Sequence, residues 1–171
     1  MEKSKFTKEQ IQEKVKGGSG WLSVVLALMG CFMIALSVAT LMGALKLHGQ
    51  PGNTEAHIGL SSLLARSFNG LFYAAVLFTL TVLFRNIKNT GTPFTDTVIK
   101  KLYIISGLMF ASSVLSPVFA IIAAHLMEGN ANYRVIFSDM GFGVVLALIM
   151  LALAWIFRYG TMLQQESDET L

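Results

Sequence analysis

The sequence predicts an all-α integral membrane protein, an antiparallel bundle of four transmembrane helices with a short N-terminal cytoplasmic amphipathic helix. Three observations predict this class. Hydrophobic residues make up 54% of the chain and charged residues only 13%, about half the charge of an average soluble domain. Four long apolar runs follow one another along the chain. Lysine and arginine gather in alternate connections between those runs, as expected of a multi-pass membrane protein.

The apolar runs cover residues 21–45, 67–84, 102–127 and 140–157. A spanning helix needs roughly 20 apolar residues, because the hydrocarbon core is about 30 Å thick and each residue rises about 1.5 Å. Arginines flank the two shorter runs, and their long side chains can reach the headgroups. Since backbone groups in lipid must bond internally, we expect helices rather than strands. The predicted helices, near 21–45, 66–85, 98–127 and 139–159, form a single membrane domain over 21–171.

Residues 1–20 are predicted to form a separate basic segment and hinge. The stretch 3–16, KSKFTKEQIQEKVK, holds five lysines and fits a helix lying at the membrane surface. Residues 17–20, GGSG, then predict a flexible hinge. A signal peptide also begins with lysines and an apolar run. This apolar run is longer than a typical signal segment, and no clear small-residue cleavage site follows it.

Positive charge is distributed unequally between the two sides of the predicted bundle. Ten of the 13 Lys+Arg residues lie in the N-terminal segment, the connection between the second and third helices, or the C-terminal tail. The remaining three lie in the other two connections. The positive-inside rule therefore predicts that both ends of the chain are cytoplasmic.

The first external connection, 46–66, is expected to be a flexible loop without a metal site. It contains His48, Glu55 and His57, but glycine and proline separate them and their spacing fits no known ligand pattern. Cys31 is the only cysteine, so no cysteine metal cluster and no internal disulfide is possible. We expect no metal and no cofactor.

The third predicted helix carries a row of small residues. The helix-packing candidates are Gly107, Ala111, Ser112, Ser116, Pro117 and Ala120. Such rows let helices approach closely, and Pro117 is expected to kink the helix. A kink that lines a ligand path is the alternative. No acidic residue lies deep in any run, which disfavours a proton pump or ion carrier. No nucleophile–base pair or phosphate loop is visible, so we expect no enzyme.

Two motifs stand out, FRNIKNTGTPFTDTVIKKL at 84–102 and FRYGTMLQQESDETL at 157–171. Together they resemble domain-of-unknown-function family 2975, small bacterial membrane proteins with four helices. The matching positions are Gly91, Pro93, Phe94, Tyr159, Gly160, Leu163, Gln164, Glu166, Asp168 and Thr170. The resemblance covers the second to fourth helices best, and the first 20 residues and the first external loop show none of it. It implies a location in the bacterial inner membrane and no established activity.

The resemblance also implies a role as the membrane partner of a small helix-turn-helix regulator. Both motifs are predicted to face the cytoplasm, and they carry complementary charge. Our first hypothesis is a binding or regulatory protein that holds a transcriptional regulator without touching nucleic acid. The candidate partner-binding residues are Gly91, Pro93, Phe94, Lys100, Lys101, Tyr159, Gly160, Leu163, Gln164, Glu166 and Asp168. The alternative is a homo-oligomeric small transporter or channel, in which Asn69, Ser112 or Ser116 faces a wet path. A lipid-modifying enzyme has no candidate catalytic residue.

Overall fold

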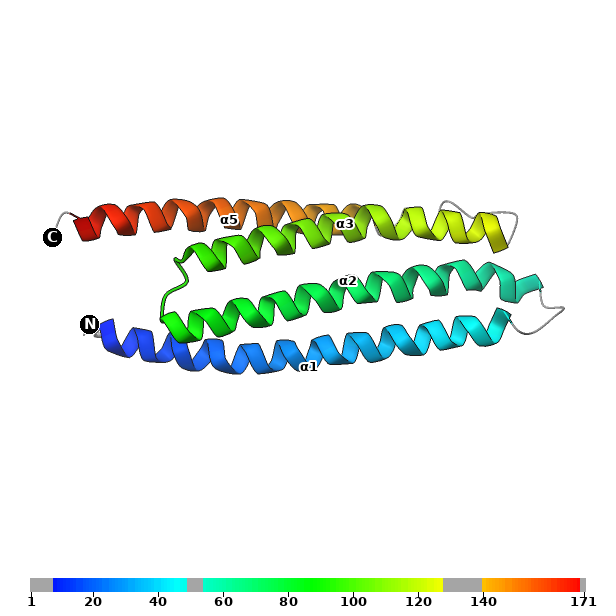
Figure 1. Cartoon of the computed structure of the whole chain (residues 1–171), viewed down its shortest axis with the longest axis horizontal. Helices are drawn as coiled ribbons and strands as arrows, with labels where there is room; N and C mark the ends of the chain where they lie inside the picture. The colour runs from blue at the N-terminus through cyan, green and yellow to red at the C-terminus, as the bar shows by residue number, and fades with distance from the viewer. Residues whose placement is uncertain (1–7, 49–53, 128–139, 170–171) are drawn as a thin grey trace, which may run out of the picture.

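The computed structural model describes residues 8–48, 54–127 and 140–169, and its elements are four helices (Figure 1). They are α1 (Lys8–His48), α2 (Thr54–Thr90), α3 (Asp96–Met127) and α5 (Met140–Glu169). Each is long and apolar enough to cross a membrane. Successive helices run antiparallel, so the N- and C-terminal ends lie at the same end of the molecule as the connection between α2 and α3. This confirms the predicted class, and the chain is a multi-pass membrane protein.

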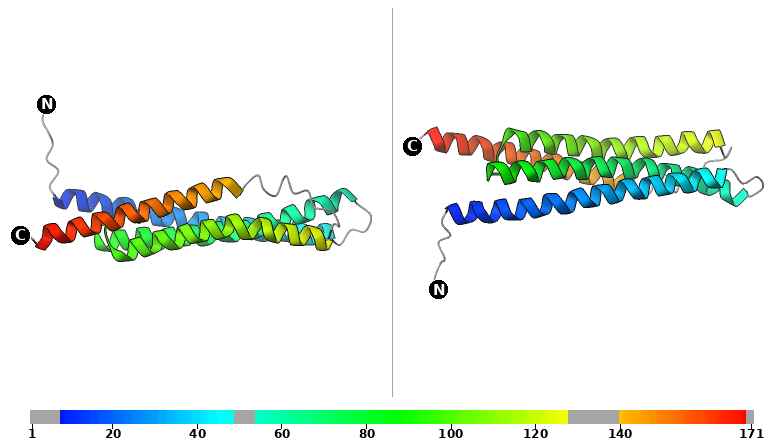
Figure 2. Two further views of the ribbon diagram at one scale, coloured as in Figure 1. Left: turned by 90° about the horizontal axis from the view of Figure 1, so that it is seen from above. Right: turned by 60° about the horizontal axis from the view of Figure 1, so that its bottom comes forward.

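The helices pack in the order in which they occur in the chain. α1 packs along α2, α2 packs against α3, and α3 packs against α5. α1 and α5 therefore form the two edges of the arrangement, and over the described residues they do not pack along each other. Figure 2 shows the four helices running alongside one another from two further directions.

The helices extend beyond the apolar runs from which they were predicted. α1 begins at Lys8 and continues unbroken through 17–20, where we expected a hinge. The Ser19 hydroxyl donates to the Lys16 carbonyl at 3.2 Å, and Gly20 lies against the Lys88 side chain of α2. α2 begins inside the stretch expected to be a loop, and α5 continues to Glu169. Hydropathy marks only the part of a helix that lies in lipid, whereas helical hydrogen bonding continues past it.

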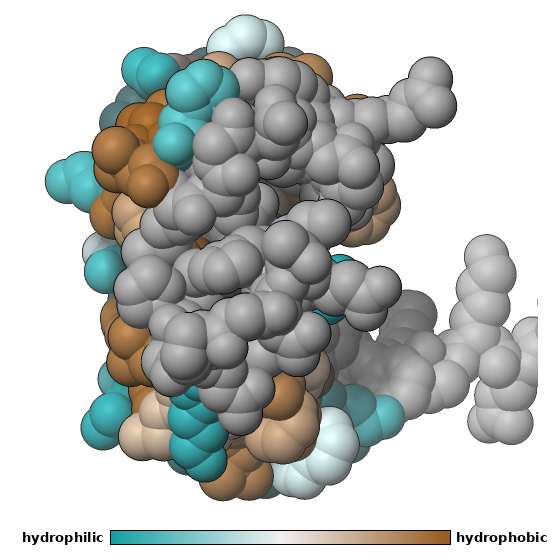
Figure 3. Space-filling view, turned by 90° about the vertical axis from the view of Figure 1, so that its right-hand side faces the viewer, coloured by the Kyte–Doolittle hydropathy of each residue, from teal (hydrophilic) through white to brown (hydrophobic). Residues whose placement is uncertain are grey.

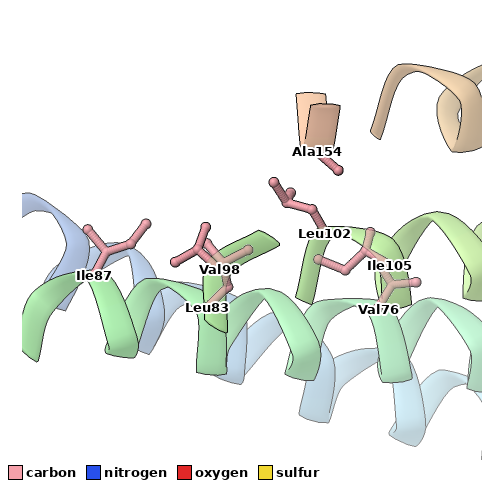
Figure 4. Close-up of a cluster of buried hydrophobic side chains, with 7 residues drawn as sticks. All are labelled: Val76, Leu83, Ile87, Val98, Leu102, Ile105 and Ala154. Carbon is pink, nitrogen blue, oxygen red and sulfur yellow. The ribbon is translucent and has the colours of Figure 1, made fainter. Parts of the chain in front are cut away.

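The buried core lies mainly between α2 and α3, towards the end that carries the termini. Its members are Val76, Leu83, Ile87, Val98, Leu102, Ile105 and Ala154 (Figure 4). Large apolar side chains also lie on the outside of the helices, and brown hydrophobic residues appear among teal ones beside the grey atoms of the end-on view (Figure 3). Leu28, Phe32 and Trp155 are 66%, 63% and 64% exposed. An apolar exterior of this kind suits hydrocarbon, because lipid tails are as apolar as leucine.

Small polar residues join each pair of adjacent helices. Among the described residues, such hydrogen bonds include Thr40–Ser67 at 2.7 Å, Ser116 to the Ala65 carbonyl at 3.3 Å, and Ser106 to the Ala147 carbonyl at 2.8 Å. They connect α1 with α2, α2 with α3, and α3 with α5. Hydrogen bonds and close backbone approach are what associate helices in lipid, where no hydrophobic force acts between them.

Two serine–glycine contacts bring the helices of each hairpin close together. In α1, Ser37 donates to the Met33 carbonyl at 2.8 Å, and its hydroxyl lies where a side chain on Gly70 of α2 would begin. In α3, Ser113 makes the same bond to the Met109 carbonyl at 2.9 Å and lies in the same way against Gly143 of α5.

Candidate functional site

The connection between α2 and α3 is a tight turn that glycine makes possible. Gly91 has a φ of +73°, and its N–H donates to the Ile87 carbonyl at 2.8 Å. This is a left-handed helix cap, a conformation in which a side chain is strained and which glycine adopts freely. The turn therefore ends α2 directly after Thr90.

Side-chain hydrogen bonds then start α3. The Phe94 N–H donates to the Thr92 hydroxyl at 3.2 Å, and the Val98 N–H donates to the Thr95 hydroxyl at 3.4 Å. Thr95 thus caps the helix, with Asp96 in the first turn. Phe94 is held at the end of a short, well-bonded turn.

Phe94 is directed at α5. Its ring meets Phe157 edge-on, with centroids 5.6 Å apart and an interplanar angle of 64°. A Cβ built on Gly160 would lie only 2.7 Å from the nearest Phe94 ring carbon. Gly160 therefore leaves space that the Phe94 ring occupies. The two motifs singled out from the sequence are in contact.

α1 reaches the same turn through Lys16. The aliphatic part of the Lys16 side chain lies against Gly91, with Cε 3.0 Å from where a glycine Cβ would stand. The positive ammonium group is thereby held near the C-terminus of α2, where the helix dipole is negative. We call the set Lys16, Gly91, Phe94, Phe157 and Gly160 the rim. It joins α1, the turn and α5 at the end of the molecule that holds both chain termini (Figure 1).

The remaining partner-binding candidates lie on the turn, at the start of α3 and on the extension of α5. Tyr159 and Leu163 are 64% and 47% exposed on α5. Lys100 and Glu166 are exposed, and Lys101 and Pro93 are half-buried. Gln164 and Asp168 lie within α5, but their side chains are outside the described part, as is Thr170 altogether. The structure thus brings together Gly91, Phe94 and Gly160 from the predicted set.

The small-residue row of α3 is divided between the inside and the outside of the bundle. Ser112, Ser116, Pro117 and Ala120 are buried and Ala111 is half-buried, whereas Gly107 is exposed with no atom near its Cβ position. Ser112 donates to the Met109 carbonyl of its own helix at 2.9 Å. On α2, Asn69 has a buried side-chain oxygen with no hydrogen-bond partner within the described residues.

Sequence reasoning missed the glycines that accept a neighbouring side chain. Gly20 lies under Lys88, and Gly70 and Gly143 lie against serines. The signal available was a pair of similar four-residue spacings, Met33 to Ser37 and Met109 to Ser113. The spacing indicates a helix contact only once Gly70 and Gly143 are known to lie opposite the two serines.

A comparison with known protein families matches the part of the chain that carries both motifs. The family model for proteins of unknown function DUF2975 matches residues 48–171, which include α2, the turn, α3 and α5. The match also includes the first connection, where no resemblance was noted. No curated protein and no solved structure matches the chain. Because the matched range covers well over half of the chain, the protein belongs to the DUF2975 family of proteins of unknown function.

Proposed function

We propose that this chain is a non-enzymatic protein of the bacterial inner membrane that binds a cytoplasmic protein through the extension of α5 beside the rim. The rim end is taken as cytoplasmic because ten of the 13 Lys+Arg residues belong to its side. Both chain termini then lie in the cytoplasm.

A row of exposed apolar side chains on α5 carries the proposal. Tyr159, Met162 and Leu163 are 64%, 47% and 47% exposed. They follow Arg158, the last positive residue of α5, so the proposal places them outside the hydrocarbon. Spacings of three and four put them on one face of the helix. In water such a face stabilises the protein only when covered, and a helix presenting it fits a groove on a partner.

The charge beyond this face favours a basic partner. Glu166 and Glu169 continue the helix on its exposed surface. A small DNA-binding regulator carries a positive surface that such residues attract. The contact between Phe94 and Gly160 supports the role, because it anchors α5 to the turn and gives the extension a defined direction. The proposed occupant is a helix-turn-helix regulator held at the membrane by protein contact alone.

The test uses the full chain in its native membrane. A photo-crosslinking amino acid replaces Tyr159, and a second copy of the experiment replaces Leu148, which is 59% exposed on the same helix within the apolar run. We expect a cytosolic regulator to be captured from position 159 only. The double variant Tyr159→Ala/Leu163→Ala should lose that adduct and alter transcription of the regulator's targets. Equal capture at both positions, or unchanged transcription, would contradict the proposal.

A second candidate, a small homo-oligomeric transporter or channel, rests on Asn69. Its buried side-chain oxygen, which has no hydrogen-bond partner in the described part of the chain, is the kind of group that a polar solute or water would satisfy. In a Cys31→Ala background, single cysteines at 69, 112 and 116 would react with a membrane-impermeant thiol reagent if they line a wet path. If none of the three cysteines reacts with the reagent, they do not line a water-filled path, and the transporter or channel hypothesis is contradicted.

A further inference from the structure

The two helical hairpins of this chain are repeats of one another. The identical pairs in α1 and α3 are Leu26/Leu102, Met33/Met109, Ala35/Ala111, Ser37/Ser113, Val38/Val114 and Ala44/Ala120. The identical pairs in α2 and α5 are Gly70/Gly143, Ala74/Ala147, Leu80/Leu153, Phe84/Phe157 and Arg85/Arg158. Within each helix pair the spacing between matched residues is constant, so no insertion interrupts the match.

The matched residues also make matched contacts. In both hairpins a serine donates to the methionine carbonyl one turn earlier, at 2.8 Å and 2.9 Å, and lies against the glycine of the second helix. Both hairpins cross the bundle in the same direction. They are therefore parallel repeats, an arrangement found in other membrane proteins.

The contact between the two repeats uses one face of α3 and one face of α2. Val98, Ile105 and Ser112 recur at intervals of seven on α3 and are 1%, 0% and 3% exposed. On α2, Val76 and Leu83 are both 4% exposed. In the close-up, Val98 lies beside Leu83 and Ile105 beside Val76 (Figure 4).

Residues equivalent to these two faces occur on α1 and α5, where they are exposed. The α1 equivalents of the α3 residues are Leu22, Met29 and Leu36, which are 38%, 47% and 44% exposed. The α5 equivalents of the α2 residues are Ile149 and Ile156, which are 47% and 63% exposed. All five are large and apolar. Four of them match apolar core positions, and Leu36 stands where α3 has Ser112.

We infer that a second copy of this chain covers these two faces, with α5 of each copy packing on α1 of the other. Within one chain, α2 and α3 lie between the two edges, and α1 and α5 do not pack along each other. In the dimer, the exposed face of α1 in one copy, which matches the α3 face, would pack on the exposed face of α5 in the other copy, which matches the α2 face. Copies inserted in the same direction make α1 and α5 antiparallel, as α3 and α2 are. Two such contacts cover both edge helices, α1 and α5, of each copy, so the assembly closes as a dimer.

The register of the contact follows from the internal one. The pair Ile105 and Val76 becomes Met29 of one copy and Ile149 of the other, and Val98 with Leu83 becomes Leu22 with Ile156. In a Cys31→Ala background, Met29→Cys is placed in one tagged full chain and Ile149→Cys in a second chain with a different tag. Oxidation of native membranes should produce a disulfide-linked product that carries both tags. Leu22→Cys with Ile156→Cys should behave in the same way.

The matched control moves each cysteine by one residue. Leu28→Cys and Leu148→Cys occupy positions that are 66% and 59% exposed on the same helices but off the proposed faces. They should give no product. Equal cross-linking of the control pair would overturn the inference. So would cross-linking only within one chain when Met29→Cys and Ile149→Cys are combined.

A second measurement avoids substitutions entirely. The unmodified chain, extracted with its surrounding lipid into polymer nanodiscs, should be found at two copies per particle by single-molecule counting. One copy per particle, together with no cross-linked product, would mean that lipid alone covers these faces.

Discussion

At the scale of single residues, glycine decides how the rim is built. Gly91 provides the backbone conformation of the turn, and Gly160 provides the space for Phe94. The two roles differ physically, because the first concerns a backbone angle and the second concerns steric overlap. The following two predictions separate them.

Gly160→Ala should displace the Phe94 ring and destabilise the contact between the turn and α5. Adding a methyl group to a filled space costs roughly 1–3 kcal/mol. The measurement is the free energy of unfolding in detergent, by titration with sodium dodecyl sulfate. Phe94→Ala should remove most of the penalty when combined with Gly160→Ala, because the overlap is then gone. Additive effects of the two changes would show that Phe94 does not occupy that space.

Gly91→Ala should destabilise the turn through its backbone, at a cost of about 1–2 kcal/mol for a left-handed residue with a side chain. Gly107→Ala is the matched control, because Gly107 is helical and no atom lies within 4 Å of its Cβ position. The control should be neutral or slightly stabilising, since alanine favours a helix. Protease sensitivity at Lys100 and Lys101, near the start of α3 just after the turn, reports the difference. Equal sensitivity of the two variants would refute the assigned conformation.

At the scale of helices, each hairpin is held by its own serine–glycine contact. Gly70→Ala and Gly143→Ala should each lower the melting temperature in detergent, because the new methyl group overlaps a serine hydroxyl. Ser37→Ala should rescue the first variant and Ser113→Ala the second. Rescue should not occur when the serine and glycine come from different hairpins. Cross-rescue, or no loss in either glycine variant, would show that the contacts do not hold the hairpins.

The lengths of the helices show where sequence reasoning was sufficient and where it was not. Hydropathy located all four helices, because a lipid-spanning stretch must be apolar over its whole length. It placed the first helix start at 21, whereas α1 begins at Lys8. A helix was also expected over 3–16, so the difference is the unbroken passage through 17–20, where Gly20 lies against Lys88 of α2. The Thr95 cap was predictable because capping is a local interaction.

At the scale of the whole molecule, the proposed orientation gives a direct prediction. Green fluorescent protein fused after Leu171 should fluoresce, and alkaline phosphatase at the same position should be inactive, because both ends are expected in the cytoplasm. A phosphatase fused at residue 50, in the first connection, should be active. The reverse pattern would place the rim outside the cell and exclude a cytoplasmic partner there.

The sequence by itself determined the four membrane helices, the basic connection between α2 and α3, and the two motifs that carry the family resemblance. These features depend on local composition and on neighbouring residues. Only the tertiary structure decided that Phe94 meets Gly160, that Lys16 lies on Gly91, and that the two hairpins repeat the same contact. Such contacts depend on how each helix is rotated about its axis. In lipid the inner and outer faces of a helix are both apolar, so hydropathy carries little record of that rotation.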